Sequence, residues 1–213
     1  MTASERETDE IVIRPAGRVR RFRSDLLQLA VVIVVVLAAR SSVADHYVIP
    51  SGSMEYTLLP GDHVFVDKSA YGMRIPFTSW KLTSGDEPTL GEVVIFDSPE
   101  DGTRLIKRIV AVEGDVVRIV DGELLVDGRS VRASGPRDLE IVGGHLAELN
   151  LSFGGGQDLP PTEIAEGQVL VVGDARGNSR DGRFFGTIAA DSIYGKARSV
   201  IYRRGDGLVW RPL

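Results

Sequence analysis

The chain has 213 residues, 43% hydrophobic and 26% charged, which suffices for one domain and a membrane anchor. The absence of cysteine excludes disulfide bonds, thiol nucleophiles and cysteine-ligated metals, and the net charge of −5 argues against nucleic acid as the main partner. The three histidines, His46, His63 and His145, lack the spacing of metal ligands, so we expect no metal and no other cofactor.

The N-terminal segment predicts a basic tail followed by a single membrane anchor. Residues 1–25 are polar and include several arginines, and the apolar run that follows extends from residue 26 to 44. As a helix this run would measure about 28 Å, close to the hydrocarbon core of about 30 Å. Because arginines favour the cytoplasmic side, we expect the N-terminus in the cytoplasm and residues 45–213 outside the plasma membrane.

The same segment has a second interpretation as a cleavable signal peptide. Ser42-Val43-Ala44 before Asp45 matches the small-residue pattern of a cleavage site. The long N-terminal tail and Arg40 inside the segment favour the uncleaved anchor. Both alternatives place the remainder of the chain outside the cytoplasm.

From residue 45 onward the sequence is typical of an all-β domain. The clearest unit is a hairpin, in which strands over 115–120 and 123–126 flank Asp121-Gly122. Further strands are expected at Tyr47–Ile49, His63–Val66, Glu92–Phe96, Thr103–Val112, Val169–Val172 and Ala197–Tyr202. No long amphipathic helix is indicated, so we predict antiparallel sheets in a barrel-like or sandwich-like arrangement.

Two stretches of this domain are irregular. Tyr71–Leu82 is too hydrophobic for an exposed loop, and two interpretations stay open: a strand pair in the core, or a ribbon in the lipid interface with Trp80 at headgroup level. Residues 131–166 are rich in glycine and proline, and their glycine clusters are interpreted as loop because they fit no phosphate-binding spacing.

Two short motifs carry candidate chemistry. Ser53 lies in Pro50-Ser51-Gly52-Ser53-Met54, where Gly52 allows a tight turn that could present the hydroxyl. A serine needs a base, and Lys107 could serve if burial held its amine neutral. In a strand Lys107 would share a face with Leu105, Ile109 and Ala111. Taken separately, an ordinary turn and an edge lysine whose head reaches water would also explain these motifs.

Three segments together resemble the type I (bacterial) signal peptidases. The segment Ile49–Met54, followed by Thr57-Leu58 and Gly61-Asp62, resembles the nucleophile box of that family. Leu105–Val110, followed by Glu113-Gly114-Asp115, resembles its lysine box, and Val172–Arg183 resembles its third box. The three segments occur in the order of the family, behind one hydrophobic segment.

The resemblance implies a membrane serine endopeptidase that removes signal peptides from secretory preproteins. Ser53 would be the nucleophile and Lys107 the general base, with an acyl-enzyme intermediate. The hydroxyl of Ser51 and the N–H of Ser53 would hold the oxyanion, and Ser179 would orient the lysine. A buried ion-pair scaffold would be formed by Asp174, Arg176, Asp181 and Arg183.

The resemblance also implies a preference for small residues at the first and third positions before the cut, as in Ala-x-Ala. The residues that would shape the substrate pockets are Tyr47, Ile49, Pro50, Met54, Leu58 and Ile106. The peptide would add a strand beside the lysine strand, and the variable insertion of the family would cover about 116–166. The implied partners are secretory preproteins and the lipid bilayer, without metal or nucleic acid.

The chain departs from the family pattern at four positions. Tyr56 stands where proline is frequent, Ala175 where asparagine is usual, Gly182 where serine is frequent and Leu105 where an aromatic residue is common. These departures bear on substrate preference more than on activity. Two alternatives remain open: a non-catalytic, membrane-tethered β interaction domain, and a peptidase dedicated to one substrate.

Overall fold

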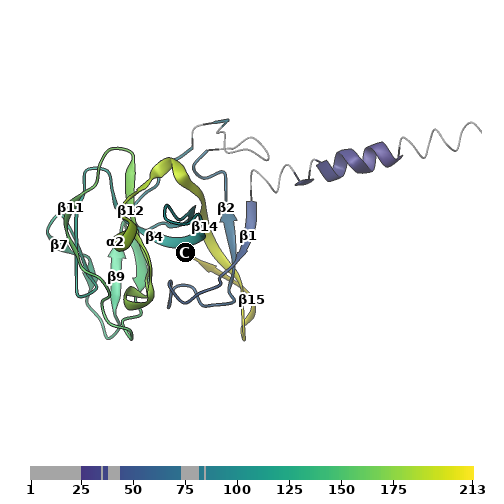
Figure 1. Ribbon diagram of the computed structural model, residues 1–213. Helices are drawn as coiled ribbons and strands as arrows, with labels where there is room; N and C mark the ends of the chain where they lie inside the picture. Colours follow the sequence, from purple (N-terminus) through teal and green to yellow (C-terminus); the bar gives the residue numbers. More distant parts are fainter. Residues whose placement is uncertain (1–24, 35, 38–43, 73–81, 84) are drawn as a thin grey trace, which may run out of the picture. The chain divides into compact units, whose positions relative to one another are not determined.

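The computed structural model describes residues 25–34, 36–37, 44–72, 82–83 and 85–213, which fall into two units, Met1–Ala38 and Ala39–Leu213 (Figure 1). In the first unit, residues 25–34 and 36–37 are helical. Within the described ranges, no helix is both long enough and apolar enough to cross a membrane. The predicted anchor includes residues 35 and 38–43, which lie outside the described residues, so it stays a prediction.

The second unit is built on an eight-stranded antiparallel sheet. Its strands follow the order β1-β2-β14-β3-β4-β12-β13, and β15 pairs with β14. The strands are β1 (Ala44–Val48), β2 (His63–Asp67), β3 (Val93–Asp97), β4 (Arg104–Val112), β12 (Gln168–Val172), β13 (Ile188–Ala189), β14 (Ile193–Arg203) and β15 (Gly207–Pro212). The antiparallel all-β prediction is confirmed.

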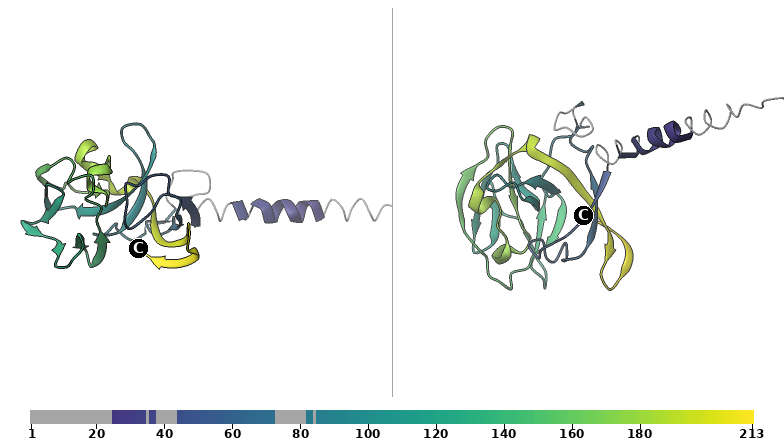
Figure 2. Two further views of the ribbon diagram at one scale, coloured as in Figure 1. Left: turned by 90° about the horizontal axis from the view of Figure 1, so that it is seen from below. Right: turned by 45° about the vertical axis from the view of Figure 1, so that its right-hand side comes forward.

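Two smaller sheets form the part of this unit that lies away from β1, β2 and β15 in both Figure 1 and Figure 2. A four-stranded sheet has the order β11-β5-β6-β7, and a three-stranded sheet has the order β10-β9-β8. Their strands are β5 (Val116–Val120), β6 (Glu123–Val126), β7 (Arg129–Ser130), β8 (Arg132–Ala133), β9 (Leu139–Val142), β10 (His145–Glu148) and β11 (Leu159–Glu163). We refer to residues 116–166 as the insertion.

The hairpin around Asp121-Gly122 is confirmed, since β5 and β6 pair with Val120 opposite Glu123. Both turn residues have positive φ, 47° and 79°, which is the geometry that favours Asp-Gly in a two-residue hairpin loop. The sequence does not predict β8 to β11 within the glycine-rich stretch. Their lengths of two to five residues are too short to show an alternating pattern, although the glycines at 143 and 144 lie in a turn as expected.

In the described part of the second unit, helical structure is confined to short segments. These are η1 (Arg176–Asn178), α2 (Gly182–Phe185) and η2 (Ala190–Ser192). Of the ambiguous stretch Tyr71–Leu82, residues 73–81 lie outside the described residues, and both interpretations of it remain predictions.

Strand β4 lies at the centre of the second unit, because it contributes to all three hydrophobic clusters. Ile106 belongs to the first cluster, Ala111 to the second and Ile109 to the third. The predicted common face of Ile109 and Ala111 is therefore wrong. A register shift between β4 and β12 interrupts the alternation between these two residues, and the strand is buried on both faces from residue 106 to 111.

A buried ion pair joins the insertion to the segment after β12. Arg176 Nη2 donates to Glu140 Oε2 at 2.5 Å, and its Nη1 donates to Gly122 O at 2.7 Å. The side chains of Arg176 and Glu140 are each only 1% exposed. Since a buried charge is costly without a partner, this pair fixes the insertion to the main sheet.

Replacing Glu140 with alanine should lower the free energy of unfolding by about 3–5 kcal/mol, because Arg176 would remain buried without its counter-charge. Urea unfolding followed by circular dichroism measures this change. The matched control is Asp138→Ala, which removes the partner of Arg132 in an exposed pair and should cost less than about 1 kcal/mol. Equal losses in the two variants would contradict a structural role for the buried pair.

Candidate active site

Ser53 lies in a turn whose start is tied to the chain near β2. The N–H of Ile49 donates to Asp62 O at 2.9 Å, and the N–H of Gly61 donates to Ile49 O at 2.8 Å. Met54, directly after the serine, is fully buried in the first hydrophobic cluster. The buried side chain of Met54 and these backbone hydrogen bonds hold Ser53 in place, and 8% of the surface of the serine is exposed.

Lys107 on β4 reaches this serine across 54 residues of sequence, and its Nζ lies 2.6 Å from Ser53 Oγ. The lysine is 2% exposed and stands directly opposite Val94 on β3. A charged ammonium would donate a hydrogen bond in this contact, whereas a neutral amine offers a lone pair to the hydroxyl proton. The arrangement has the geometry of a nucleophile beside a base.

Burial is the largest cause of a depressed pKa at Lys107, which falls from 10.5 to about 8. The carboxylates of Asp181 and Asp174 act in the opposite direction, and Arg183 adds to the depression. Near pH 8 the amine is therefore neutral in about half of the molecules, compared with roughly one in a few hundred for an ordinary lysine.

The segment after β12 packs directly on the serine turn. The N–H of Ala175 donates to Ser53 O at 3.1 Å. A Cβ on Gly173 would lie 2.5 Å from Ser53 O and 2.2 Å from Ser179 Oγ, so only glycine allows this approach. Ser179 Oγ is buried, and its contact with Asp181, which helps to lower the pKa of that carboxyl, falls short of normal hydrogen-bond geometry.

Asp174 is held in a buried network that the sequence predicts only in part. Arg108 donates to both of its carboxylate oxygens, at 3.0 and 2.8 Å, and Thr57 Oγ1 donates to it at 2.5 Å. Arg108 also donates to Gly91 O at 2.8 Å. The sequence indicated a buried Asp174 but not this partner. The signal in the sequence that could have revealed this pair is the position of Arg108 inside an otherwise apolar strand.

Asp181 pairs with Arg183 within the same segment. Arg183 Nε donates to Asp181 Oδ1 at 2.8 Å and its Nη2 donates to Oδ2 at 2.9 Å, and Gly173 N donates to Oδ2 at 2.9 Å. Burial raises the pKa of Asp181, but the hydrogen bonds and charge of Arg183 outweigh it, and the pKa is lowered. Arg176, the fourth scaffold residue of the prediction, pairs with Glu140 on β9, which the sequence did not single out. Asp174, Asp181 and Glu140 are thus each paired with a buried arginine.

The residues assigned to the substrate pockets gather mainly in one cluster beside the serine turn. Five of them belong to or pack against the first hydrophobic cluster: Tyr47, Ile49, Met54, Leu58 and Ile106. Pro50 is exposed instead. Ser51 is also exposed, and its Oγ lies 3.4 Å from Ser53 Oγ, within reach of the nucleophile but at the outer limit of a hydrogen bond.

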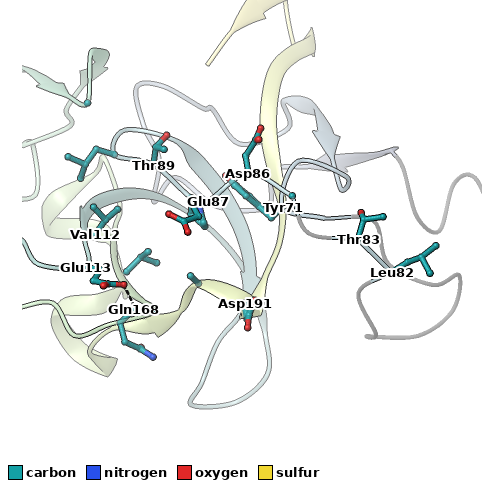
Figure 3. A pocket seen from close by; sticks show the side chains of 17 residues that line it. Tyr71, Leu82, Thr83, Asp86, Glu87, Thr89, Val112, Glu113, Gln168 and Asp191 are labelled. Atoms are coloured by element: carbon teal, nitrogen blue, oxygen red, sulfur yellow. Dashed lines mark hydrogen bonds between the residues drawn. The ribbon is translucent and has the colours of Figure 1, made fainter.

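A separate cavity of about 1080 Å³ is shown in Figure 3. Its lining includes Tyr71, Glu87, Glu113 and Asp191, and it contains none of the residues that the sequence assigned to the site. Over the described ranges, no group of three or more His, Asp or Glu side chains is arranged to hold a metal ion. The candidate chemistry therefore rests on side chains around Ser53.

The family described as signal peptidase, peptidase S26, matches residues 23–202 of the chain. The protein belongs to the S26 signal peptidase family. It is therefore a serine endopeptidase. The three segments that resemble the motifs of that family lie within the matched residues.

Two relatives above 30% identity support this membership. The chain is 32% identical to signal peptidase I of Pseudomonas fluorescens and 33% identical to that of Pseudomonas aeruginosa, with 79% of this chain and 68% of each relative covered. It is 27% identical to the Haemophilus influenzae enzyme, over 91% of this chain and 72% of that one. A crystal structure of an Enterococcus faecalis signal peptidase I shares 22% identity and a TM-score of 0.36, covering 52% of this chain and 97% of that one.

Replacing Lys107 with methionine should stabilise the folded S26 peptidase at pH 7. Lowering the pKa from 10.5 to about 8 means that the buried charged form costs about 3 kcal/mol. Between these two values the unfolded state binds more protons, so the stability of the wild type rises with pH and the advantage of the variant disappears by about pH 10.5.

Urea unfolding at pH 7 and pH 10.5 measures this difference. The control is Arg129→Met, which removes a positive charge at an exposed position on β7 and should show no such gain. The same gain for Lys107→Met at both pH values would contradict a pKa lowered by burial.

Gly173→Ala should reduce proteolysis and stability together, because its methyl group would displace either Ser179 or the carbonyl of Ser53. We expect activity to fall by about 100-fold, in line with a displacement of about 1 Å at a reacting group. Gly135→Ala is the matched control, since its Cβ would meet only Leu139 at 3.9 Å. Proteolysis assays on both variants, with thermal unfolding, provide the measurement.

Proposed function

We propose that the protein is a membrane-bound signal peptidase that cuts exported preproteins after small residues, as in Ala-x-Ala. The observation that carries the proposal is the 2.6 Å distance between Lys107 Nζ and Ser53 Oγ at a buried site. Family membership and relatives called signal peptidase I support removal of signal peptides as the reaction.

In the first half of the reaction, neutral Lys107 accepts the Oγ proton of Ser53 as this oxygen attacks the scissile carbonyl. The tetrahedral intermediate collapses, the C–N bond breaks, and Lys107 transfers the proton to the leaving amine. The signal peptide remains attached to Ser53 as an ester. In the second half, Lys107 accepts a proton from water, the resulting hydroxide attacks the ester, and the proton returns to Ser53 Oγ.

The oxyanion of each intermediate needs donors that are already in place. The backbone N–H of Ser53 and the hydroxyl of Ser51 are the proposed pair. Ser179 would orient the lysine amine, a role supported by its buried Oγ, which lies on the same side of Gly173 as the carbonyl of Ser53. Asp174 and Asp181 act through their ion pairs as a scaffold and take no proton in the reaction, since both are paired with arginines.

The substrate would bind as an extended strand, with small side chains near the cluster that contains Ile49 and Ile106. Residues 26–44 would anchor the protein in the plasma membrane, with residues 1–25 in the cytoplasm and 45–213 outside. The exposed apolar side chains of the helical residues 26–34 support a lipid environment for that segment. This arrangement brings the peptidase to preproteins as they leave the membrane.

The proposal is tested by incubating detergent-solubilised protein with a secretory preprotein that has an Ala-x-Ala junction, and by locating the cut from intact mass. The wild type should cut after the second alanine, whereas Ser53→Ala and Lys107→Ala should lose activity by at least about 1,000-fold. Circular dichroism establishes that the variants are folded. Cleavage by Lys107→Ala at the wild-type rate would contradict the assigned base.

The pH dependence gives a second test of the base. Since the neutral amine is the active form, kcat/KM should rise tenfold per pH unit below the pKa and level off above about 8. Lys107→Arg keeps a charge at every accessible pH and should be inactive throughout the range. A folded wild type that is inert on several preproteins but cuts one particular protein would instead establish a dedicated peptidase.

A further inference from the structure

The insertion returns to the nucleophile turn at its residues 148–150. The N–H of Tyr56 donates to Glu148 O at 3.2 Å, and Tyr56 forms an isolated antiparallel bridge with Leu149. The next residue, Asn150, is 3% exposed. A buried polar side chain needs hydrogen-bond partners, and those of Asn150 show what it holds in place.

The side chain of Asn150 is fixed in one orientation. Its Oδ1 accepts from Ser152 N at 2.9 Å, which directs Nδ2 to the carboxylate of Glu55, where it donates to Oε2 at 3.0 Å. The backbone N–H of Asn150 donates to Asp174 O at 3.1 Å. Asn150 thus contacts the nucleophile turn through its side chain and the segment after β12 through its backbone.

Glu55 in turn covers the residue before the nucleophile. A Cβ on Gly52 would lie 2.8 Å from Glu55 Oε1 and 2.9 Å from its Cδ, so the carboxylate folds back against the Gly52 backbone. The N–H of Glu55 donates to Gly52 O at 3.1 Å. Because glycine restricts its own backbone so little, the orientation of the peptide bond between Gly52 and Ser53 depends on such external contacts.

We propose that Asn150 and Glu55 are positioning residues that hold the Gly52–Ser53 peptide in the orientation needed for proteolysis. The inference rests on the proposed function, in which Ser53 supplies both the attacking Oγ and one oxyanion donor. Rotation of the preceding peptide would move both groups together. Asn150 acts through Glu55, and neither residue touches the reacting atoms.

Exchanging the amide of Asn150 and the carboxylate of Glu55 between the two positions tests this assignment. Asn150→Asp keeps the acceptor for Ser152 but sets a second carboxylate against Glu55, which replaces a hydrogen bond with repulsion. Glu55→Gln keeps an acceptor for Asn150. In the double variant E55Q/N150D, the new amide of residue 55 can donate to the new carboxylate, so the bond is restored with its direction reversed.

We expect Asn150→Asp to lower kcat by about 30-fold with KM within about threefold of the wild type, since small misplacements of reacting groups act on the chemical step. Glu55→Gln should stay within about threefold of the wild type. The double variant should recover kcat to within about threefold, which is the coupling expected of two residues in direct contact. In the double variant, which keeps the net charge of the wild type, the rise of kcat/KM with pH should also keep its midpoint.

Asp138→Asn is the matched control in the same insertion, because it alters an exposed ion pair and should leave kcat unchanged. Thermal unfolding of each variant separates a loss of folded protein from a loss of turnover. Failure of the wild type to cut any preprotein would contradict the proposed function. If the wild type cuts, an Asn150→Asp variant with unchanged kcat, or a double variant no better than it, would overturn the positioning role.

Discussion

The removal of the Lys107 amine from water is the constraint on which the site depends. A lysine on the surface would remain charged at neutral pH and would have no lone pair to offer Ser53. Strand β4 meets this requirement because it is buried on both faces and lies between β3 and β12. The central position of β4 in the sheet therefore serves the chemistry of Lys107 as well as the packing of the hydrophobic core.

Two adjacent basic residues on β4 are both buried, yet their pKa values shift in opposite directions. Arg108 has its guanidinium bonded directly to Asp174, and although burial lowers its pKa, the charge and hydrogen bonds of that carboxylate raise it. Lys107 has carboxylates nearby, but its hydrogen bond is to a neutral hydroxyl, and burial prevails. One residue stabilises the structure as a permanent charge, and its neighbour is kept near its titration point.

The sequence predicts the local parts of this protein well, but of its long-range pairings it indicates only that of Ser53 with Lys107, through the resemblance to the family. The hairpin at Asp121-Gly122 and the extent of β4 follow from turn chemistry and from runs of β-branched residues. The bonds of Arg108 to Asp174 and of Asn150 to Glu55 join residues 66 and 95 positions apart, and no local pattern encodes them. The short strands of the insertion escape prediction for a different reason, because two to five residues show no reliable period.

The position of β14 has a consequence for biogenesis. This strand begins at Ile193, later in the sequence than all but one of the strands of the main sheet, yet it lies between β2 and β3. The part of the sheet that follows the serine turn and the part that contains Lys107 are therefore joined by a strand that is synthesised after both of them. Contacts of such large sequence separation form slowly. A nascent chain would thus complete the sheet that carries the serine turn and Lys107 only after β14 has been synthesised.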